Sequence, residues 1–188
     1  PFALEFSKKI VRAKIHNQIV VLDRYGRSRQ MNVQEATQNM KILERKVFTC
    51  TSIDQIMGYE GAAARYYFST LGRLVESDFR FEKRSRRPPK DAFNSMLSLG
   101  YSMLMNEIYG KLENRGLNPY FGFMHQDREK HPTLASDLME EWRAVIVDAV
   151  VMNLINGHEI KIEQFNYDTY GNGVFLNRDA MKIFINKM

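Results

Sequence analysis

Glu60 is a carboxylate in the middle of an apolar helical stripe, which makes it the clearest candidate for metal or acid–base chemistry in the chain. Apolar residues recur around it at the three- and four-residue spacing of one helix face: Ile53, Ile56, Met57, Ala63, Ala64, Tyr67, Leu71 and Leu74. A lone buried carboxylate is costly unless it is paired, protonated or bound to a cation. A structural salt bridge to Arg65 or Arg73 is the alternative, and this segment alone leaves both interpretations open.

Further groups that could share an ion with Glu60 come later in the chain. His125 ends an apolar, glycine-containing segment, and the predicted helix that follows carries Asp137, Glu140 and Glu141. A mixed set of imidazole nitrogen and carboxylate oxygens suits a divalent ion such as Mn²⁺ or Mg²⁺, whereas zinc sites favour His and Cys. Taken singly, a loop histidine is more often a surface group, and acidic residues near a helix start commonly complement its dipole. The combination predicts a metal site.

Positive charge is concentrated just after the predicted Glu60 helix. The chain has a net charge of +5, and residues 80–90 alone carry a surplus of five, from Arg80, Lys83, Arg84, Arg86, Arg87 and Lys90 against Glu82. Such a segment attracts phosphate backbones by counterion release and carries little sequence information. A solvated loop is the alternative. Because the segment lies between the candidate metal-bearing helices, we favour a DNA contact, to which Arg73 could add.

Composition describes a globular protein of a reducing compartment. The 188 residues are 44% hydrophobic, which is sufficient for a real core. Cys50 is the only cysteine, so no internal disulfide is possible, and a small buried apolar role is expected for it. No run approaches the roughly 18 apolar residues of a membrane span, and the first residues lack a signal-peptide pattern. We therefore expect a cytoplasmic protein without membrane contact.

The periodicity predicts an all-α fold. Long helices are predicted at about 2–23, 33–48, 52–77, 91–114 and 134–155, with a polar turn at 23–32 and a short last helix capped by Asn177. Ser52 and Gln55 form a capping-box pattern, and Gly116 is a stop signal. The 134–155 helix is apolar over most of its circumference, which predicts a central position with Glu140 facing inward. Residues 118–132 are predicted to be a mobile loop, 160–170 a strand or extended arm, and 171–173 a turn.

Five motifs carry a resemblance to a known family. They are GYEGAAAR at 58–65, RRPPKD at 86–91 with Asn94, LGY at 99–101, His125, and SDLMEEWR at 136–143. In this order they resemble the Cas1 family of CRISPR-associated integrases, which capture new spacers. The resemblance covers nearly the whole chain, from Phe2 to Lys187. Five separate motifs in the right order are specific evidence.

The resemblance implies a site and a domain organisation. In the family a glutamate, a histidine and an acidic residue fifteen positions later hold a divalent metal, and the matching positions here are Glu60, His125 and Glu140. Asp137 matches a further acidic position, and only the motif alignment favours Glu140 over Glu141. The chain would be the helical catalytic domain over 1–188, with leading helices at about 1–50 and a catalytic core and C-terminal arm at about 51–188. Because the chain starts without Met, we expect that the family's amino-terminal β-rich domain is absent from it.

The implied activity is that of a metal-dependent DNA endonuclease and integrase. It would use Mg²⁺ or Mn²⁺ to join a 3′ hydroxyl of prespacer DNA to a phosphodiester of the CRISPR array, and would reverse this joining on branched DNA. Implied partners are double-stranded and branched DNA, a second copy in the full-length protein, and the small companion Cas2, in a prokaryotic cytoplasm. Expected DNA contacts are Arg73, Arg84, Arg86, Arg87 and Lys90. The alternatives are a noncatalytic DNA-binding scaffold and a hydrolytic metal-dependent nuclease.

Overall fold

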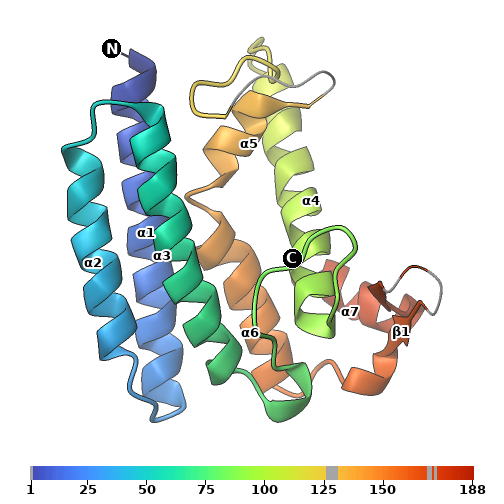
Figure 1. Ribbon diagram of the computed structural model, residues 1–188. Helices are drawn as coiled ribbons and strands as arrows, with labels where there is room; N and C mark the ends of the chain where they lie inside the picture. The colour runs from blue at the N-terminus through green and yellow to red at the C-terminus, as the bar shows by residue number, and fades with distance from the viewer. Residues whose placement is uncertain (1, 126–130, 169–170, 172) are drawn as a thin grey trace.

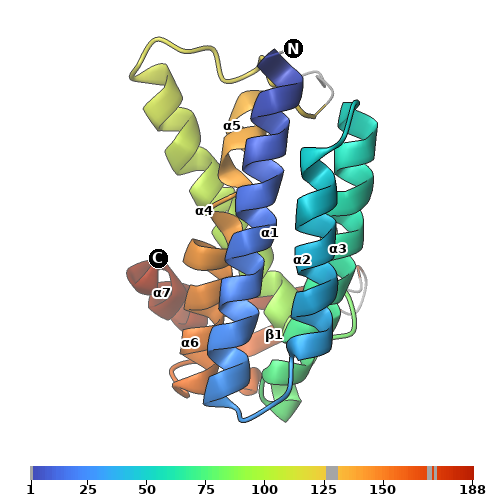
Figure 2. The same cartoon turned by 90° about the vertical axis from the view of Figure 1, so that its left-hand side faces the viewer.

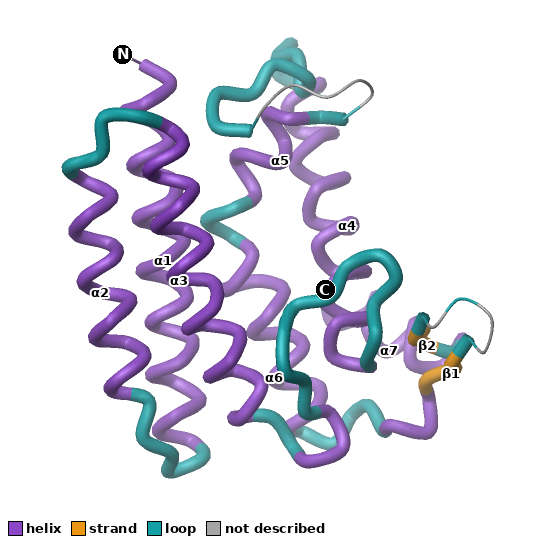
Figure 3. The backbone as a smooth tube through the Cα atoms, in the orientation of Figure 1, coloured by secondary structure: helices purple, strands orange, loops and turns teal. Residues whose placement is uncertain are grey.

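The computed structural model describes residues 2–125, 131–168, 171 and 173–188, and helices dominate it (Figure 1). The α-helices are α1 Phe2–Ser28, α2 Gln34–Phe48, α3 Ile53–Leu74, α4 Ala92–Glu113, α5 Thr133–Met139, α6 Ala149–Asn156 and α7 Arg178–Lys187. Short 3-10 turns occur at Ser77–Phe79 and Ile162–Gln164, and a π-helical turn covers Arg143–Asp148. The strands β1 Phe165–Tyr167 and β2 Val174–Leu176 pair antiparallel near the C-terminus (Figure 3). The predicted all-α fold class is confirmed.

The helices form two groups that face each other. The long helices α1, α2 and α3 pack on one another, as two views at right angles show (Figures 1 and 2). In the second group, α4 packs against α5, the π-helical turn and β2, and α1 also contacts the π-helical turn. Fully buried side chains such as Leu22, Tyr67, Phe93 and Val147 make the core between these elements. The π-helical turn therefore joins the two groups.

Three helices begin where the sequence predicts. The Ser52 hydroxyl accepts a hydrogen bond from the Gln55 backbone at the start of α3, and the Gln55 side chain accepts from the Thr51 backbone at 2.9 Å. Side chains also cap α4 and α7, through Asp91 and Asn177. These caps occupy backbone N–H groups that a helix start leaves without intrahelical partners. Two of these helices, α3 and α4, line the site described below.

The turn predicted at residues 23–32 is wrong in its first half, because α1 continues to Ser28. Gly26, interpreted as a turn residue, lies inside the helix and is buried. A Cβ atom at this position would lie 2.9 Å from Cγ2 of Val33. Gly26 therefore allows the chain that leads into α2 to pack closely against α1, rather than providing the turn.

The continuous helix predicted at 134–155 is also wrong. It is divided into α5, a turn, the π-helical turn and α6. Wider π-helical winding changes which positions face the core. Val147 and Val151 are buried, whereas 47% of the Trp142 surface and 37% of the Val145 surface are exposed. The segment is central, as predicted, but it is not apolar on all sides.

The remaining structural predictions can be compared only with the described residues. The described residues of the predicted 118–132 loop contain no helix or strand, and residues 126–130 lie outside the described residues. The predicted turn at 171–173 includes residue 172, which also lies outside them. Cys50 is buried, as expected. Among the described helices, none is both long and apolar enough to cross a membrane.

Candidate active site

A cavity of about 1610 Å³ lies between the two groups of helices. Its walls come from α1, α3, α4, α5 and the chain segments that precede α4 and α5. Its charged and titratable side chains are Lys14, Asp54, Glu60, Arg84, Arg86, Arg87, Tyr101, His125, His131, Glu140 and Arg143. The structure thus brings all three predicted metal ligands and three of the five predicted DNA contacts to one cavity.

Two of the predicted ligands share one lysine. The Lys14 ammonium on α1 donates to Glu60 Oε1 and to Glu140 Oε2, the latter at 2.5 Å. The other Glu140 oxygen forms an ion pair with Arg143 at 3.0 Å. Arg65 and Arg73 are exposed on α3. The alternative of a salt bridge to Glu60 is therefore correct in kind, but its partner is Lys14 rather than Arg65 or Arg73.

Lys14, Glu60, Glu140 and Arg143 form a cluster in which each charge stabilises its oppositely charged neighbours. Burial by itself would raise the pKa of Glu140, but Lys14 and Arg143 outweigh it and hold the pKa at about 2. Burial would lower the pKa of Lys14, yet Glu140 and Glu60 raise it above its ordinary value. Near neutral pH, the cluster therefore contains a buried cation between two carboxylates.

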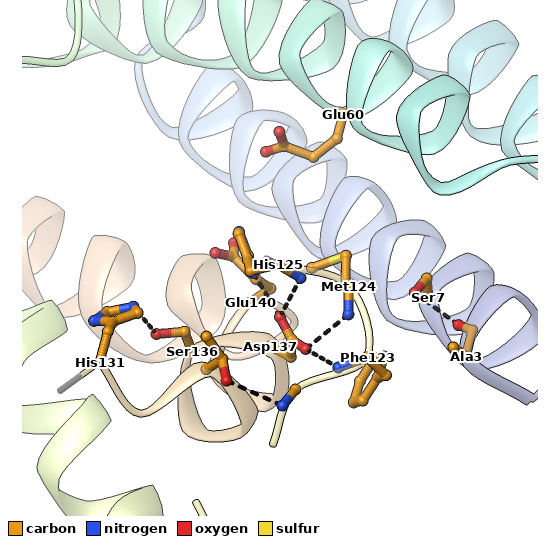
Figure 4. A network of polar contacts seen from close by, with 12 residues as sticks. Ala3, Ser7, Glu60, Phe123, Met124, His125, His131, Ser136, Asp137 and Glu140 are labelled. Atoms are coloured by element: carbon orange, nitrogen blue, oxygen red, sulfur yellow. Dashed lines mark hydrogen bonds and ion pairs between the residues drawn. The ribbon is translucent and has the colours of Figure 1, made fainter. Parts of the chain in front are cut away.

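His125 is held by Asp137 (Figure 4). Asp137 is fully buried, and its Oδ2 accepts from the backbone N–H groups of Phe123 and Met124 at 2.7 and 2.9 Å. Its Oδ1 accepts from the His125 backbone at 3.1 Å and contacts the ring nitrogen Nδ1. A Cβ atom at Gly122 would lie 2.8 Å from Asp137 Oδ2, so only glycine lets the backbone lie this close to the Asp137 carboxylate.

This arrangement gives Asp137 a supporting position. A carboxylate on one ring nitrogen orients a histidine whose other nitrogen binds a metal, and it fixes the tautomer. Both oxygens of Asp137 are engaged by residues 123–125, so it is placed behind His125. The possible direct ligand role predicted for Asp137 is less favoured by this geometry than the role of a positioning residue.

The donor set suits a divalent ion of the hard or borderline class. Within the described residues, no three His, Cys, Asp or Glu side chains converge closely enough to hold one ion as they stand. The Lys14 ammonium nevertheless lies on Glu60 and Glu140 together, and so marks a cation position between them. Carboxylate oxygens of Glu60 on α3 and of Glu140 after α5, with the remaining nitrogen of His125, are suitable ligands for Mg²⁺ or Mn²⁺.

The structure also separates the two neighbouring glutamates. Glu140 is 4% exposed and lines the cavity. Glu141 is half-buried outside the cavity lining, and its backbone oxygen accepts from Asn17 at 2.8 Å. Glu140 is therefore the better-placed candidate for the third ligand, in agreement with the motif alignment.

The predicted DNA contacts differ in their surroundings. Arg84 donates to Asn94 Oδ1 at 2.9 Å and to Ser98 Oγ at 3.1 Å, and burial lowers its pKa. Arg86 and Arg87 are exposed and line the cavity. Arg73 and Lys90 are exposed but do not belong to the cavity lining, so their contact with DNA stays a prediction.

Sequence reasoning missed two charged groups of this region. Lys14 lies four residues after Ile10 and three after Val11, on the buried face of α1. Asp148 is 1% exposed and lies in the apolar run 144–152. Both repeat the signal that identified Glu60, a charged residue on an apolar face, and could have been found by the same argument.

Asp148 is the centre of a second network that orders the cavity wall. The hydroxyls of Tyr101 and Tyr67 donate to its two oxygens at 2.6 and 2.7 Å. The guanidinium carbons of Arg84 and Arg143 lie 5.3 and 4.7 Å from the centre of the Tyr101 ring. Cation–π contact of this kind orients a guanidinium. Tyr101 therefore holds two cationic groups of the cavity in place.

This network predicts a pH dependence of stability. Burial raises the pKa of Asp148 from 3.8 to about 6, although Tyr101, Tyr67, Arg143 and Arg84 act in the opposite direction. A group whose pKa is raised by folding favours the folded state below pH 3.8, and this contribution is lost as the pH rises through about 6. The shift corresponds to about 3 kcal/mol.

Urea unfolding of the unchanged chain and of Asp148→Asn at pH values between 4 and 7 measures this contribution. Between pH 4 and pH 7 the free energy of unfolding of the unchanged chain should fall by about 2 kcal/mol relative to that of Asp148→Asn, since part of the change lies below pH 4. Asp179→Asn, at an exposed residue of α7, controls for the loss of one charge. A constant difference between the two proteins over this range would contradict the prediction.

Comparison with known protein families identifies the class to which this chain belongs. A family model described as CRISPR associated protein Cas1 matches residues 1–188. The chain is 44% identical over 181 residues to a CRISPR-associated endonuclease Cas1 of Mycobacterium tuberculosis, covering 96% of this chain and 53% of that protein. The chain therefore spans about half the length of this relative.

Solved structures agree with this result. A Cas6-RT-Cas1–Cas2 complex matches with a TM-score of 0.90 and 34% identity over 99% of this chain and 21% of that one. A casposase bound to integration product matches with a TM-score of 0.87 and 27% identity over 98% of this chain and 51% of that one. The chain belongs to the CRISPR-associated protein Cas1 family.

Proposed function

We propose that this chain is the catalytic part of a DNA integrase that joins a 3′ hydroxyl of prespacer DNA to a phosphodiester of the CRISPR array. The same site would reverse the joining on branched DNA. The observation that carries this proposal is that Glu60, His125, Glu140 and four arginines all line one cavity. Relatives named endonucleases, and the likeness to a casposase bound to integration product, support the same reaction class.

The carboxylates and the imidazole would hold the metal. In this proposal Glu60, His125 and Glu140 bind one Mg²⁺ or Mn²⁺, and Asp137 orients the His125 ring through its Nδ1. A bound ion of this kind polarises a phosphodiester and stabilises the charge that develops on the departing oxygen. The DNA itself provides the nucleophile, a 3′ hydroxyl, so no Ser, Tyr or Cys beside a base is required.

The arginines would position the DNA. Arg143 faces the reacting end of the cavity because it pairs with Glu140 at 3.0 Å and lies over Tyr101. Arg86 and Arg87 are exposed to an incoming phosphate backbone. Arginine binds phosphate oxygens with two parallel N–H donors, which fixes the orientation of the backbone as well as its distance.

The product identifies the reaction. The chain is incubated with a branched DNA in Mn²⁺, and joined, released and cut strands are separated on a denaturing gel. Strand release with joining of the remaining strands supports the integrase. Cut strands without joining indicate the hydrolytic nuclease. DNA binding without any metal-dependent product indicates the noncatalytic scaffold, and no product in the presence of Cas2 would contradict the proposal.

The partners follow from the same proposal. One of the similar structures is a Cas6-RT-Cas1–Cas2 complex, which supports Cas2 as the companion of this chain. We also propose double-stranded and branched DNA as ligands and a homodimer as the working form. Integration at two ends of one prespacer requires two active sites, which a two-fold symmetric pair would supply.

Removal of two arginines tests the DNA contact. Arg86→Gln with Arg87→Gln should weaken DNA binding and lower the slope of log Kd against log salt concentration by about two, because two phosphate contacts are lost. Arg84 is left unchanged, since it also fixes Asn94. Fluorescence anisotropy titrations at salt concentrations from about 50 to about 200 mM measure this slope.

The matched control removes the same charge from another helix. Lys41→Gln with Arg45→Gln alters two exposed residues of α2, which contributes no described side chain to the cavity lining. The control should leave the slope unchanged. An equal decrease in both double variants would mean that net charge, rather than the basic segment, determines DNA binding.

A further inference from the structure

The Lys14 ammonium lies between the two carboxylates that would bind the metal. It donates to Glu60 on α3 and to Glu140 after α5, and only 10% of its side-chain surface is exposed. An ion bridging these two carboxylates would need the same position. Two cations cannot share it, since like charges in a site of low dielectric repel strongly.

We propose that Lys14 is an internal counter-cation that competes with the divalent metal for Glu60 and Glu140 and is displaced when the metal binds. This inference rests on the metal site of the proposed function. In the metal-free protein, Lys14 neutralises the carboxylates and ties α1 to both α3 and the segment after α5. Metal loading is then an exchange of one buried cation for another.

The geometry permits this exchange without loss of the other contacts. Lys14 uses Oε2 of Glu140, whereas Arg143 uses Oε1, so the metal can take the lysine's oxygen while the arginine keeps its own. Lysine is a point charge on a flexible four-carbon stem, which can move more readily than the Arg143 guanidinium, which lies over the Tyr101 ring. Lys14 also lines the cavity, so the displaced ammonium has open space beside it.

The competing interpretation is that Lys14 is a permanent structural partner of the two carboxylates. It predicts the opposite change in metal affinity when Lys14 is removed. If Lys14 only held the carboxylates in position for the metal, its removal would misplace them and weaken metal binding. If Lys14 competes for the carboxylates, its removal vacates their oxygens and strengthens metal binding. The sign of the change in metal affinity therefore separates the two roles.

Calorimetric titration with Mn²⁺ alone, without DNA, measures this sign. Lys14→Met, which keeps the length of the side chain but removes the charge, should bind Mn²⁺ at least about tenfold more tightly than the unchanged chain. Lys8→Met is the matched control on the same helix, because Lys8 pairs with Glu5 at 2.8 Å outside the cavity lining. An unchanged or weaker affinity in Lys14→Met would overturn the inference.

Thermal unfolding gives a second readout. Without its counter-cation, Lys14→Met should unfold at a temperature several degrees lower than the unchanged chain in EDTA, because two carboxylates lose a partner. Saturating Mn²⁺ should raise the unfolding temperature more in Lys14→Met than in the unchanged chain. An equal rise in both proteins would contradict competition.

The unchanged chain can be tested directly in case the variant does not fold. Acylation of lysine amines, followed by mass spectrometry, reports which amines are accessible. Mn²⁺ should increase the labelling of Lys14 and leave that of Lys8 constant. Constant labelling of Lys14 at a Mn²⁺ concentration that saturates the protein would overturn displacement.

Two further variants separate failure of this inference from failure of the metal site. Glu60→Gln and Glu140→Gln should each abolish Mn²⁺ binding if the proposed site is correct. If they abolish it and Lys14→Met does not strengthen it, only the role of Lys14 is wrong. If they leave Mn²⁺ binding intact, the metal lies elsewhere and both proposals fail.

Discussion

Glu140→Gln is expected to reduce strand release and joining on branched DNA by roughly 10³-fold or more in Mn²⁺. The substitution keeps the shape of the side chain but removes the charge that would hold the metal. Glu140 is 4% exposed, so water cannot readily replace the lost ligand. Initial rates on a labelled branched substrate, measured under conditions in which the unchanged chain is active, test this expectation.

The neighbouring glutamate provides the control. Glu141→Gln removes the same charge one residue later, from a side chain outside the cavity lining, and should change the rate by less than about threefold. Circular dichroism and unfolding temperature of both variants show whether the fold is retained. Loss of activity in Glu141→Gln with retention in Glu140→Gln would reverse the assignment of the third ligand.

Gly72→Ala is expected to destabilise the protein by about 3 kcal/mol. A Cβ atom at Gly72 would lie 2.3 Å from the backbone oxygen of Phe81. A backbone oxygen cannot rotate away as a flexible side chain can, so α3 and the chain at Phe81 must separate. Phe81 stacks on Phe93 with ring centres 4.4 Å apart, and this separation would disturb that contact. Equilibrium unfolding in urea measures the loss.

Gly61→Ala places the same substitution on the same helix in open space. No atom lies within 4 Å of a Cβ at Gly61, counted without the helix's own nearby backbone. Alanine has the higher helix propensity, so this variant should be more stable by about 0.5–1 kcal/mol. Similar changes in both variants would show that contact with Phe81 does not determine the effect.

Much of the fold follows from local rules that the sequence displays. The starts of α3, α4 and α7 are set by Ser52, Asp91 and Asn177, whose side chains bond nearby backbone groups. Such contacts involve residues two to four apart, so a sequence pattern contains them. The end of α1 lies where Val33, seven residues further on, packs on Gly26. The divided 134–155 segment contacts α1 and α4, which are distant in the chain, and a local pattern does not contain such contacts.

The candidate site also contains residues that the sequence could predict and residues that only the fold identifies. Glu60 could be recognised because its helix face is apolar, and His125 and Glu140 because their motifs match a family. The cation that pairs with Glu60 is Lys14, which lies 46 residues earlier in the chain. Only the fold brings Lys14 close to Glu60. From the sequence, Arg65 or Arg73 of the same helix was offered as an alternative partner, and Lys14 was not considered. The role of Asp137 behind His125 likewise needed the fold.

The π-helical turn at Arg143–Asp148 has a consequence for how this segment can change. Arg143 at its start faces the cavity, and Asp148 at its end is buried against Tyr67 and Tyr101. Each residue of an α-helix advances the chain by about 100°. Deletion of one residue here, such as exposed Val145, would let the turn rewind as α-helix with both ends nearly in place, because the wider π-helical winding holds about one extra residue in the same rotation. Insertion of a further residue has no such outlet. Since the core would hold Asp148 and α6 fixed, an insertion would rotate Arg143 and Glu140 by roughly 100°. We therefore expect this turn to tolerate a deletion far better than an insertion.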